Sequence, residues 1–418
     1  MESSSERVVI TGLGTVNAVA AGAPAFAKAL KAGARGIGPI TVFDTAPFRT
    51  EIGGEVRGFS PTWVPRRYRG RRRSRADHMA VFTALEALTD AGLDPDGAGA
   101  GLRESIGVVI GGGAGGMLEC EAVYRDYLAA GPDRVRMSPF SAFCCASSAD
   151  QIATAFGLMG PKTTFMTACS SGATAIGYAR DLVRSGAARM VVAGGTEPLS
   201  RITYAAFNGL QAVDPAPCRP FDRDRRGLSL GEGAGVLILE SLSSARDRGA
   251  RIYAEVLGYG VSCDAHHMTA PDPTADGAIR CITAALTDAG IPPAAVDHIN
   301  AHGTATPAND RMETAAIKAV FGDRAYRIPV SATKSMHGHT LGAAGAIEAV
   351  ASALAIADGF IPPTIHHTTP DPECDLDYVA DGPRPYAPTV VLSNSFAFGG
   401  NNTALVLGRY TDGGIGHD

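Results

Sequence analysis

The sequence predicts an α/β fold made of two similar halves that pack against each other. A short segment recurs in both halves of the chain, and strand and helix patterns alternate in the same order after each copy. The strands are almost continuously apolar, which is typical of sheets that are covered by helices on both faces. With 418 residues, the chain is long enough for each half to bury its own interior.

The recurring segment is Leu-Thr-Asp-Ala-Gly, which occupies residues 88–92 and again residues 286–290. In both places it closes an Ala/Leu pattern of helical period, with a glycine at the C-cap. An apolar strand pattern follows each copy, at 106–110 and at 296–300. We therefore expect the same helix and strand unit twice.

Two further pairs of segments continue the correspondence. The strand patterns at 163–168 and 328–332 each enter a helix that is rich in small residues. The strand pattern at 189–193 precedes Gly194-Gly195, and the strand pattern at 389–392 precedes the segment 393–400, which ends in two glycines. The order of elements is therefore the same in both halves.

The charged stretch 241–251 separates the two series of elements. We place the boundary there, which gives an N-terminal half of residues 1–250 and a C-terminal half of residues 251–412. The first half carries insertions without a counterpart, around 35–80 and 112–150. Insertions of this length usually build a substrate channel or a subunit interface.

Composition and charge exclude several classes of protein. The net charge of −5 argues against nucleic-acid binding, because phosphate contacts require an excess of Lys and Arg. The N-terminus lacks the basic and apolar regions of a secretory signal, and no apolar run approaches the roughly 20 residues of a membrane span. We therefore expect a cytoplasmic protein that does not bind membranes. Its eight cysteines are scattered, so we expect free thiols and no metal centre.

One cysteine has a context that suggests chemistry. Cys169 lies where a strand pattern stops and a helix pattern begins, followed by Ser170, Ser171 and Gly172. A thiol at a helix N-terminus has a lowered pKa and favours the thiolate, which makes it a better nucleophile. The alternative is an inert, buried cysteine that fills space as a small apolar residue.

Two histidines and a lysine complete the candidate site. His302 follows a strand pattern on a glycine-containing turn, and Lys334 and His339 occupy the position in the second half that corresponds to Cys169 in the first. A pseudo-twofold fold would bring these strand ends together. Taken singly, each histidine could be structural and the lysine a surface cation, but three such coincidences at matched strand ends favour a catalytic site.

Four motifs in this order resemble the signatures of elongating β-ketoacyl-acyl-carrier-protein synthases. They are Thr167-Ala-Cys-Ser-Ser-Gly172, Ala301-His-Gly-Thr-Ala-Thr306, Lys334-Ser-Met-His-Gly-His339 and Asn394-Ser-Phe-Ala-Phe-Gly-Gly400. The resemblance covers nearly the whole chain. It implies a thiolase-like fold, in which two duplicated halves form a five-layer α-β-α-β-α arrangement, and it implies a dimer.

The resemblance also implies a role for each residue. Cys169 would take an acyl group from the phosphopantetheine of an acyl carrier protein, so no cofactor is bound permanently. His302 and His339 would bind the malonyl thioester oxygen, and the backbone N–H groups of Cys169 and Phe398 would form an oxyanion hole. Lys334 would give electrostatic support, with Glu313 as its partner. Thr304 and Thr306 would bind the pantetheine amides, and Phe398 would gate the acyl pocket.

Some residues depart from the housekeeping members of this family. Ala397 stands where a glycine is usual, Asn401 where a threonine is usual, and His337 where a threonine is usual. The methyl group of Ala397 could stiffen the gating loop, because glycine tolerates backbone conformations that alanine resists. We therefore expect type II polyketide or specialised fatty-acid biosynthesis. The sequence does not decide whether a monovalent cation binds near Glu313 and Glu348.

Several arginines could dock the acidic acyl carrier protein, since opposite charges steer association. They are Arg66, Arg67, Arg71, Arg72, Arg75 and Arg219. The basic run could equally be a solvated surface or a subunit contact. The sequence leaves open a homodimer or a heterodimer with a related ketosynthase-like subunit. The alternative function is that of a non-catalytic, chain-length-determining partner, but such partners usually lack the cysteine.

Overall fold

The structure is a computed structural model, and it describes residues 6–70, 73–97 and 99–412. Its main sheet runs in the order β11-β10-β12-β13-β9-β1-β8-β7-β5-β6. The strands of the N-terminal half are β1 (Val8–Asn17), β5 (Ile106–Gly111), β6 (Lys162–Phe165), β7 (Met190–Glu197) and β8 (Gly233–Ser241). The strands of the C-terminal half are β9 (Ala254–Cys263), β10 (His298–Asn300), β11 (Val330–Ser331), β12 (Val390–Ala397) and β13 (Asn401–Gly408). Three short strands lie outside this path: β2 (Ala20–Ala21), β3 (Gly38–Pro39) and β4 (Ile52–Gly53).

The two halves have the same strand pairing. In the first, β5 is parallel to β6 and β7, and β8 pairs antiparallel with β7 and β1. In the second, β10 is parallel to β11 and β12, and β13 pairs antiparallel with β12 and β9. Among the described residues, strand pairing joins the halves through β1 and β9, at Val9 with Glu255 and at Ile10 with Ala254. The predicted duplication is therefore confirmed, and residues 1–250 and 251–412 remain our proposed limits for the halves.

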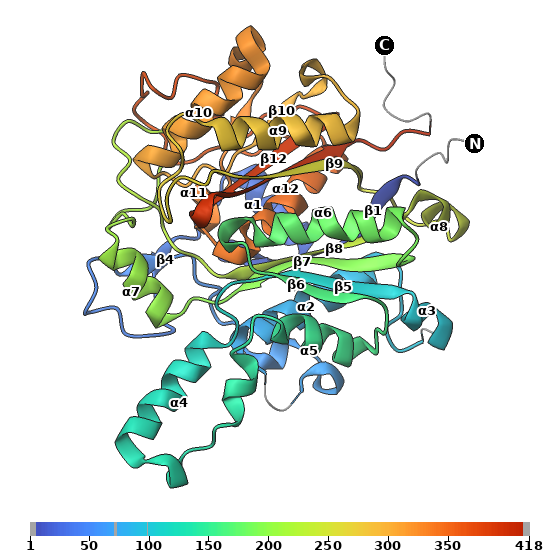
Figure 1. Cartoon of the computed structure of the whole chain (residues 1–418), viewed down its shortest axis with the longest axis vertical. Helices are drawn as coiled ribbons and strands as arrows, with labels where there is room; N and C mark the ends of the chain where they lie inside the picture. Colours follow the sequence, from blue (N-terminus) through green and yellow to red (C-terminus); the bar gives the residue numbers. More distant parts are fainter. Residues whose placement is uncertain (1–5, 71–72, 98, 413–418) are drawn as a thin grey trace.

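Helices and sheets alternate in five layers (Figure 1). The outer layers are α9 (Asp276–Ala289) with α10 (Pro307–Phe321), and α2 (Arg75–Asp90) with α5 (Ser147–Phe156). The strands of the two halves fold over each other as two sheets that are joined through β1 and β9. The central layer, between these two sheets, is α6 (Ser171–Arg184) with α12 (Ala344–Asp358). The remaining α-helices are α1 (Ala23–Ala32), α3 (Ala100–Glu104), α4 (Met117–Ala130), α7 (Arg201–Gly209), α8 (Leu242–Asp247) and α11 (Lys334–His337). This arrangement confirms the expected thiolase-like layering.

The repeated Leu-Thr-Asp-Ala-Gly segment ends α2 in the first half and α9 in the second. Its glycines have positive φ angles, 70° at Gly92 and 66° at Gly290, a conformation that costs glycine little. The repeat therefore marks the same helix end twice.

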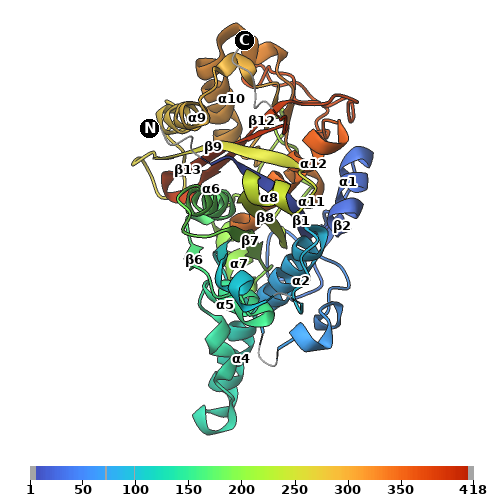
Figure 2. The ribbon, with the colours of Figure 1, turned by 90° about the vertical axis from the view of Figure 1, so that its right-hand side faces the viewer.

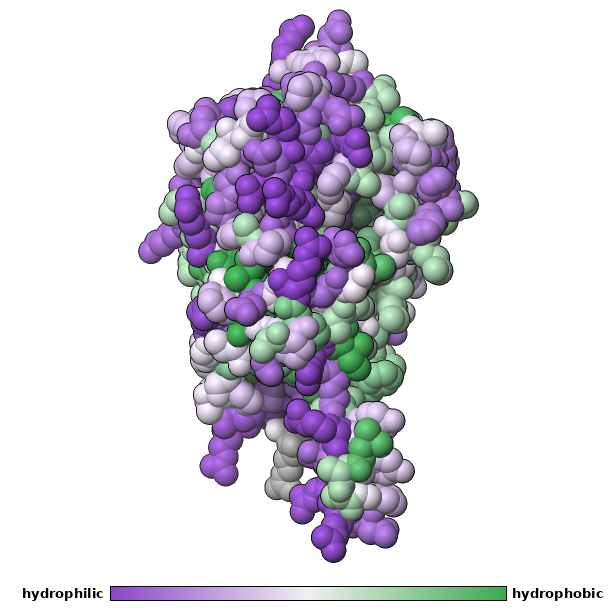
Figure 3. Space-filling view, turned by 90° about the vertical axis from the view of Figure 1, so that its left-hand side faces the viewer, coloured by the Kyte–Doolittle hydropathy of each residue, from purple (hydrophilic) through white to green (hydrophobic). Residues whose placement is uncertain are grey.

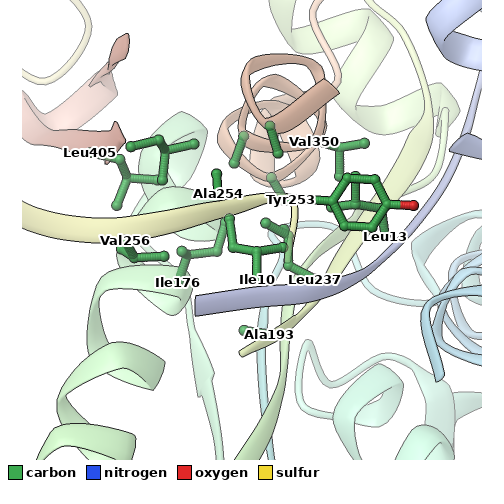
Figure 4. Packing of buried hydrophobic residues seen from close by; sticks show 14 of the residues in the cluster. Ile10, Leu13, Ile176, Ala193, Leu237, Tyr253, Ala254, Val256, Val350 and Leu405 are labelled. Atoms are coloured by element: carbon green, nitrogen blue, oxygen red, sulfur yellow. The ribbon is translucent and has the colours of Figure 1, made fainter. Parts of the chain in front are cut away.

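The central helices pack closely because small residues face each other. A Cβ atom on Gly345 would lie 2.7 Å from Cβ of Ala173, and one on Gly172 would lie 2.9 Å from the backbone nitrogen of Ala346. Farther along, Ile176 and Val350 pack among strand residues of both halves (Figure 4). This close approach brings the start of α6 next to the start of α12.

One helical stretch, Leu341–Asp358, is long and apolar enough to cross a membrane, although the sequence suggested that no apolar run came close. Of this stretch, 83% is buried in the fold. It is the core helix α12 with the turn before it, so its apolarity reflects burial between the two sheets.

The second insertion projects from the body of the molecule (Figures 1 and 2). It contains α4 and the short helices η3 (Pro132–Arg134) and η4 (Ser138–Ala142). Figure 3 shows hydrophobic side chains among polar ones on this projection. Tyr124 and Leu128 of α4 are both more than half exposed, so this segment presents apolar surface to its surroundings.

Candidate active site

The predicted site residues meet where strands of both halves end. Cys169 follows β6, and His302 follows β10. Lys334 and His339 follow β11, and Phe398 follows β12. Cys169, both histidines and Phe398 line one cavity of about 350 Å³, whereas Lys334 is buried directly behind His302. The structure therefore brings together the residues that the repeat argument placed at matched strand ends.

Cys169 lies in a tight turn, η5 (Ala168–Ser170), between β6 and α6. Ala168 has a φ angle of 50°, which is uncommon for a residue other than glycine and marks a strained turn. The Ser171 hydroxyl donates to the Ala168 carbonyl at 2.6 Å and accepts from the Thr167 N–H at 2.9 Å. These two hydrogen bonds hold the turn that presents the Cys169 thiol to the cavity.

The expected lowering of the Cys169 pKa is wrong. Burial raises the pKa of this thiol to about 12, although the positive charge of Lys334 and the backbone N–H of Phe398 act in the opposite direction. Helix α6 begins at Ser171, two residues after the cysteine, and desolvation of the thiolate outweighs the helix dipole. Burial therefore favours the protonated thiol over the thiolate at Cys169.

The two histidines present N–H groups to the cavity. The backbone N–H of Leu341 donates to Nδ1 of His339 at 3.2 Å, and Lys334 Nζ lies 3.3 Å from Nδ1 of His302. Burial lowers the pKa of both imidazoles well below the usual value, so both rings are neutral. A neutral imidazole whose Nδ1 accepts carries its proton on Nε2. His339 Nε2 lies 3.1 Å from Cys169 Sγ.

Lys334 is paired with Glu348 rather than with Glu313, so that part of the sequence prediction is wrong. The Lys334 ammonium forms a buried ion pair with Glu348 of α12 and donates to the His302 carbonyl oxygen at 2.6 Å. Glu313 instead accepts the backbone N–H groups of His302 and Gly303, both at 2.8 Å. Glu313 therefore fixes the turn that carries His302, and Lys334 fixes its ring.

The ligating atoms of Cys169, His302 and His339 lie within 4.8 Å of one another, which is close enough for a metal ion. Metal ligands must be deprotonated, however, and here burial favours a proton on the thiol while the donors at both Nδ1 atoms favour a proton on each Nε2. A cluster of N–H donors around a cavity suits an oxygen atom that gains negative charge. The geometry therefore favours binding of an oxyanion over binding of a metal.

A second group of polar atoms lies behind the cavity. Several buried oxygens have no hydrogen-bond partner among the described residues: Glu348 Oε2, Asn300 Oδ1, Asn394 Oδ1 and Ser395 Oγ. Asn300 donates to the Glu348 main-chain carbonyl at 3.1 Å, and Asn394 donates to Glu313 at 3.1 Å. Unpaired oxygens of this kind fit a hard cation.

The predicted gate residue is held by several contacts. The ring of Phe398 stacks on Phe207 of α7, with centroids 5.4 Å apart. Its carbonyl oxygen accepts from the Asn401 side chain at 3.1 Å. Gly399, with a φ angle of 79°, donates its N–H to the Met268 carbonyl at 2.8 Å. No feature of the sequence predicts that the loop around Met268 contacts the gate residue.

The two threonines line the same cavity nearer its mouth. Thr304 and Thr306 lie in the turn after His302, with their hydroxyl oxygens 2.9 Å apart. The mouth also includes Arg226 and Arg311, which sequence reasoning missed. The only available signal for Arg226 was its place in the charged run after Asp222.

The predicted docking arginines have different environments. Arg75 is largely buried and forms a 2.5 Å ion pair with Glu232, so its proposed role in docking is wrong. Arg66 is exposed, and Arg67 is exposed and paired with Asp96 at 2.7 Å. Arg219 is partly buried and does not line the cavity. The predictions for Arg71 and Arg72 lie outside the described residues.

Comparisons with known proteins agree with these features. The family model described as "Beta-ketoacyl synthase, N-terminal domain" matches residues 5–245, and the one described as "Beta-ketoacyl synthase, C-terminal domain" matches residues 253–368. Two proteins named 3-oxoacyl-[acyl-carrier-protein] synthase 2 are 44% identical to the chain. The one from Synechocystis sp. aligns over 97% of this chain and 98% of its own length, and the one from Coxiella burnetii over 97% and 99%.

Two solved structures are also similar. "The ishigamide ketosynthase/chain length factor" is 42% identical, with a TM-score of 0.91 over 98% of this chain and 100% of that chain. A type II polyketide ketosynthase, AntDE, solved in complex with its acyl-carrier protein AntF, is 32% identical, with a TM-score of 0.88 over 97% of this chain and 100% of that chain.

Proposed function

Because the chain belongs to the β-ketoacyl synthase family, we propose that it extends a Cys169-bound acyl chain by decarboxylative condensation with malonyl carrier protein. One observation carries this proposal. The Cys169 thiol, two imidazole N–H groups and the backbone N–H of Phe398 converge on a single cavity. This set provides a nucleophile together with donors for a developing oxyanion.

The first step transfers an acyl group to Cys169. The sulfur attacks the carbonyl of an acyl thioester, and the tetrahedral oxyanion is bound by the backbone N–H groups of Cys169 and Phe398. The C–S bond to the pantetheine sulfur then breaks, and the thiol proton of Cys169 moves to that sulfur. This exchange consumes a thiol and a thioester and forms a thioester and a thiol, so it requires no net loss of a proton. A raised Cys169 pKa is therefore compatible with the exchange.

The second step forms the new carbon–carbon bond. Malonyl thioester loses CO₂, and the Nε2–H groups of His302 and His339 bind the oxygen of the resulting enolate. The enolate carbon attacks the Cys169 thioester, and the tetrahedral intermediate collapses to the β-keto product. The released thiolate takes up a proton. Thr304 and Thr306 bind the pantetheine amides, and Phe398 gates the acyl cavity.

The acyl and malonyl groups arrive on the phosphopantetheine of an acyl carrier protein, so the enzyme needs no resident cofactor. This part of the proposal rests on the names of the relatives, which are carrier-protein synthases. Arg66 and Arg67 are exposed and remain candidates for carrier docking. The cytoplasmic location expected from the sequence belongs to the same proposal, as does a pathway in type II polyketide or specialised fatty-acid synthesis.

The buried oxygens behind the cavity would hold a monovalent cation. Glu348, Asn300, Asn394 and Ser395 would supply the ligands, and the ion would give these otherwise unpaired oxygens a partner. The cation would stabilise the fold around Lys334 and would take no part in bond formation.

A dimer through the sheet edge at β6 completes the proposal. β6 is the last strand in the sheet order, and Met166, which directly follows β6, is 68% exposed. Phe143 of the second insertion is 52% exposed. An exposed strand edge beside apolar side chains favours association with another chain. The partner is a second copy or a related ketosynthase-like subunit, and light scattering of the purified chain tests which one.

Intact-mass spectrometry after incubation with acyl carrier-protein thioesters tests the function. We expect one added acyl group, followed by a β-keto product when malonyl carrier protein is added. Acylation should vanish in Cys169→Ala and persist in Cys144→Ala, because Cys144 is more exposed but does not line the cavity. The alternative function, a non-catalytic partner subunit, is disfavoured by the contact between Cys169 and His339, and it would be supported if no carrier acylated the chain.

A further inference from the structure

The mouth of the catalytic cavity carries a cation without a partner. Arg226 is exposed and lines the same cavity as Cys169. Among the described residues it forms no hydrogen bond and no ion pair, while the other arginine at the mouth, Arg311, is paired with Glu373 at 3.3 Å. A guanidinium group that has no hydrogen-bond or ion-pair partner in the protein can bind a ligand.

The backbone on both sides of Arg226 is held in place. Arg225 is buried and forms ion pairs with Asp310 and Asp371, at 3.5 and 2.5 Å. Gly227 donates its N–H to the Ala305 carbonyl at 3.1 Å, and a Cβ atom there would lie only 2.5 Å from the Ala212 carbonyl oxygen. The side chain of Arg226 is therefore free, but its starting point is fixed beside the turn that carries Thr304 and Thr306.

The nearby carboxylates are already engaged. Asp310 accepts from the backbone N–H groups of Phe221 and Ala305, and it also faces Arg225. Asp222 accepts from backbone N–H groups of its own turn and of residues 368–369. Asp264, which lines the cavity, accepts from the Asn402 side chain at 2.6 Å. None of these carboxylates forms an ion pair with Arg226, so its charge stays available.

We propose that Arg226 binds the phosphodiester of the phosphopantetheine arm and thereby positions the thioester at Cys169. This inference rests on the proposed function. The phosphate is the charged group of the arm and lies at the end opposite to the thioester. When the thioester reaches Cys169 inside the cavity, the phosphate is left toward the mouth, where Arg226 is found. Guanidinium groups bind phosphate oxygens through paired, charge-assisted hydrogen bonds.

Two small substrates separate this contact from carrier-protein docking. The acyl thioester of phosphopantetheine carries the phosphate, and the acyl thioester of pantetheine lacks it. We expect Arg226→Ala to lower kcat/KM for acylation of Cys169 by the phosphorylated substrate about three- to tenfold, the range of an exposed charge-assisted contact. The same variant should leave kcat/KM for the unphosphorylated substrate within twofold. Arg226→Lys should recover part of the loss, because an ammonium retains the charge without the fork.

Arg223→Ala is the matched control. Arg223 lies in the same loop and is exposed, and it does not line the cavity. Within the described part of the chain, its side chain forms one ion pair, with Asp224 at 3.9 Å. Arg223→Ala should leave kcat/KM for acylation of Cys169 unchanged with both substrates. An equal loss for both substrates in Arg226→Ala, or no loss for either, would overturn the inference. Failure of the wild-type protein to be acylated by either substrate or by any carrier would instead count against the proposed function itself.

Discussion

The side-chain nitrogen of Lys334 lies 3.3 Å from Nδ1 of His302, and an ion pair with Glu348 holds it there. Replacing Lys334 by Met leaves Glu348 buried without its partner, which we expect to lower the free energy of unfolding by about 3 kcal/mol or more. It also removes the donor that keeps the His302 proton on Nε2. We therefore expect condensation to fall at least about 100-fold, as for loss of an oxyanion donor.

The double variant Lys334→Met/Glu348→Gln separates these two effects. The double variant has no buried unpaired charge, so we expect it to recover most of the free energy of unfolding, as measured by chemical denaturation. We expect its condensation activity to stay low. Recovery of condensation in the double variant would show that Lys334 acts through stability alone.

His302 and His339 should differ in the step that each supports. Of these two described histidines, His339 alone lies within hydrogen-bond distance of Cys169 Sγ. His302→Ala should therefore retain acylation of Cys169 and lose condensation by about 100- to 1000-fold. His339→Ala should impair both steps. Intact-mass measurement reports acylation, and product formation from malonyl carrier protein reports condensation. If acylation and condensation fell together in His302→Ala, the assignment of His302 to the enolate would be wrong.

The sequence was sufficient to predict which strand ends meet, because the repeated order of elements places Cys169 and His339 at equivalent positions of two similar halves. It was not sufficient to predict which acid pairs with Lys334. Glu313 lies on α10 and Glu348 on α12, and only the packing of α12 between the sheets decides that Glu348 reaches the ammonium.

The same limit applies to charge and burial. Arg75 belongs to a run of arginines whose charge predicts exposure to solvent. It is the first residue of α2, however, and its side chain is largely buried against Glu232. The pKa of Cys169 was misjudged because the helix start is visible in the sequence and the depth of burial is not. Arg226 could not be singled out among its charged neighbours, because the engagement of those neighbours is a tertiary property.

Two buried histidines should each contribute a loss of stability in mild acid. Burial lowers the pKa of His337 and of His298 to about 3, while both have an ordinary pKa of about 6.5 in the unfolded chain. Between these values the unfolded state binds protons that the folded state does not. The contribution of each histidine to stability is therefore complete well above pH 6.5 and is lost as the pH falls toward 3, by about 1.4 kcal/mol at pH 5.5.

Urea unfolding at pH 7.5 and 5.5 measures this loss. His337→Thr should reduce the difference between the two pH values by about 1.4 kcal/mol, because one of the buried titrating groups is gone. An unchanged difference would mean that His337 does not remain neutral in the folded protein.

Ala397 should stiffen the segment before the gate. Its φ and ψ angles of −112° and 157° are ordinary extended values, so this chain does not need glycine at that position. Ala397→Gly should lower the free energy of unfolding by about 0.5–1 kcal/mol through the entropy of the unfolded chain. We also expect it to widen the range of acyl chain lengths that acylate Cys169, which a series of carrier-protein thioesters would measure. If the range of chain lengths did not change, backbone stiffness at Ala397 would not control which acyl chains are accepted.

The buried oxygens of Glu348, Asn300, Asn394 and Ser395 should make stability depend on the cation in the buffer. A cation that binds only the folded protein raises its stability by mass action. We expect a higher Tm in potassium or sodium chloride than in tetramethylammonium chloride at equal ionic strength, because the organic cation is too large for a site among these oxygens. Ser395→Ala removes one ligand and should reduce the difference, whereas Ser352→Ala, a buried hydroxyl that already donates to the Glu348 carbonyl, should preserve it. Equal Tm values in all three salts would show that the unpaired oxygens are satisfied by water.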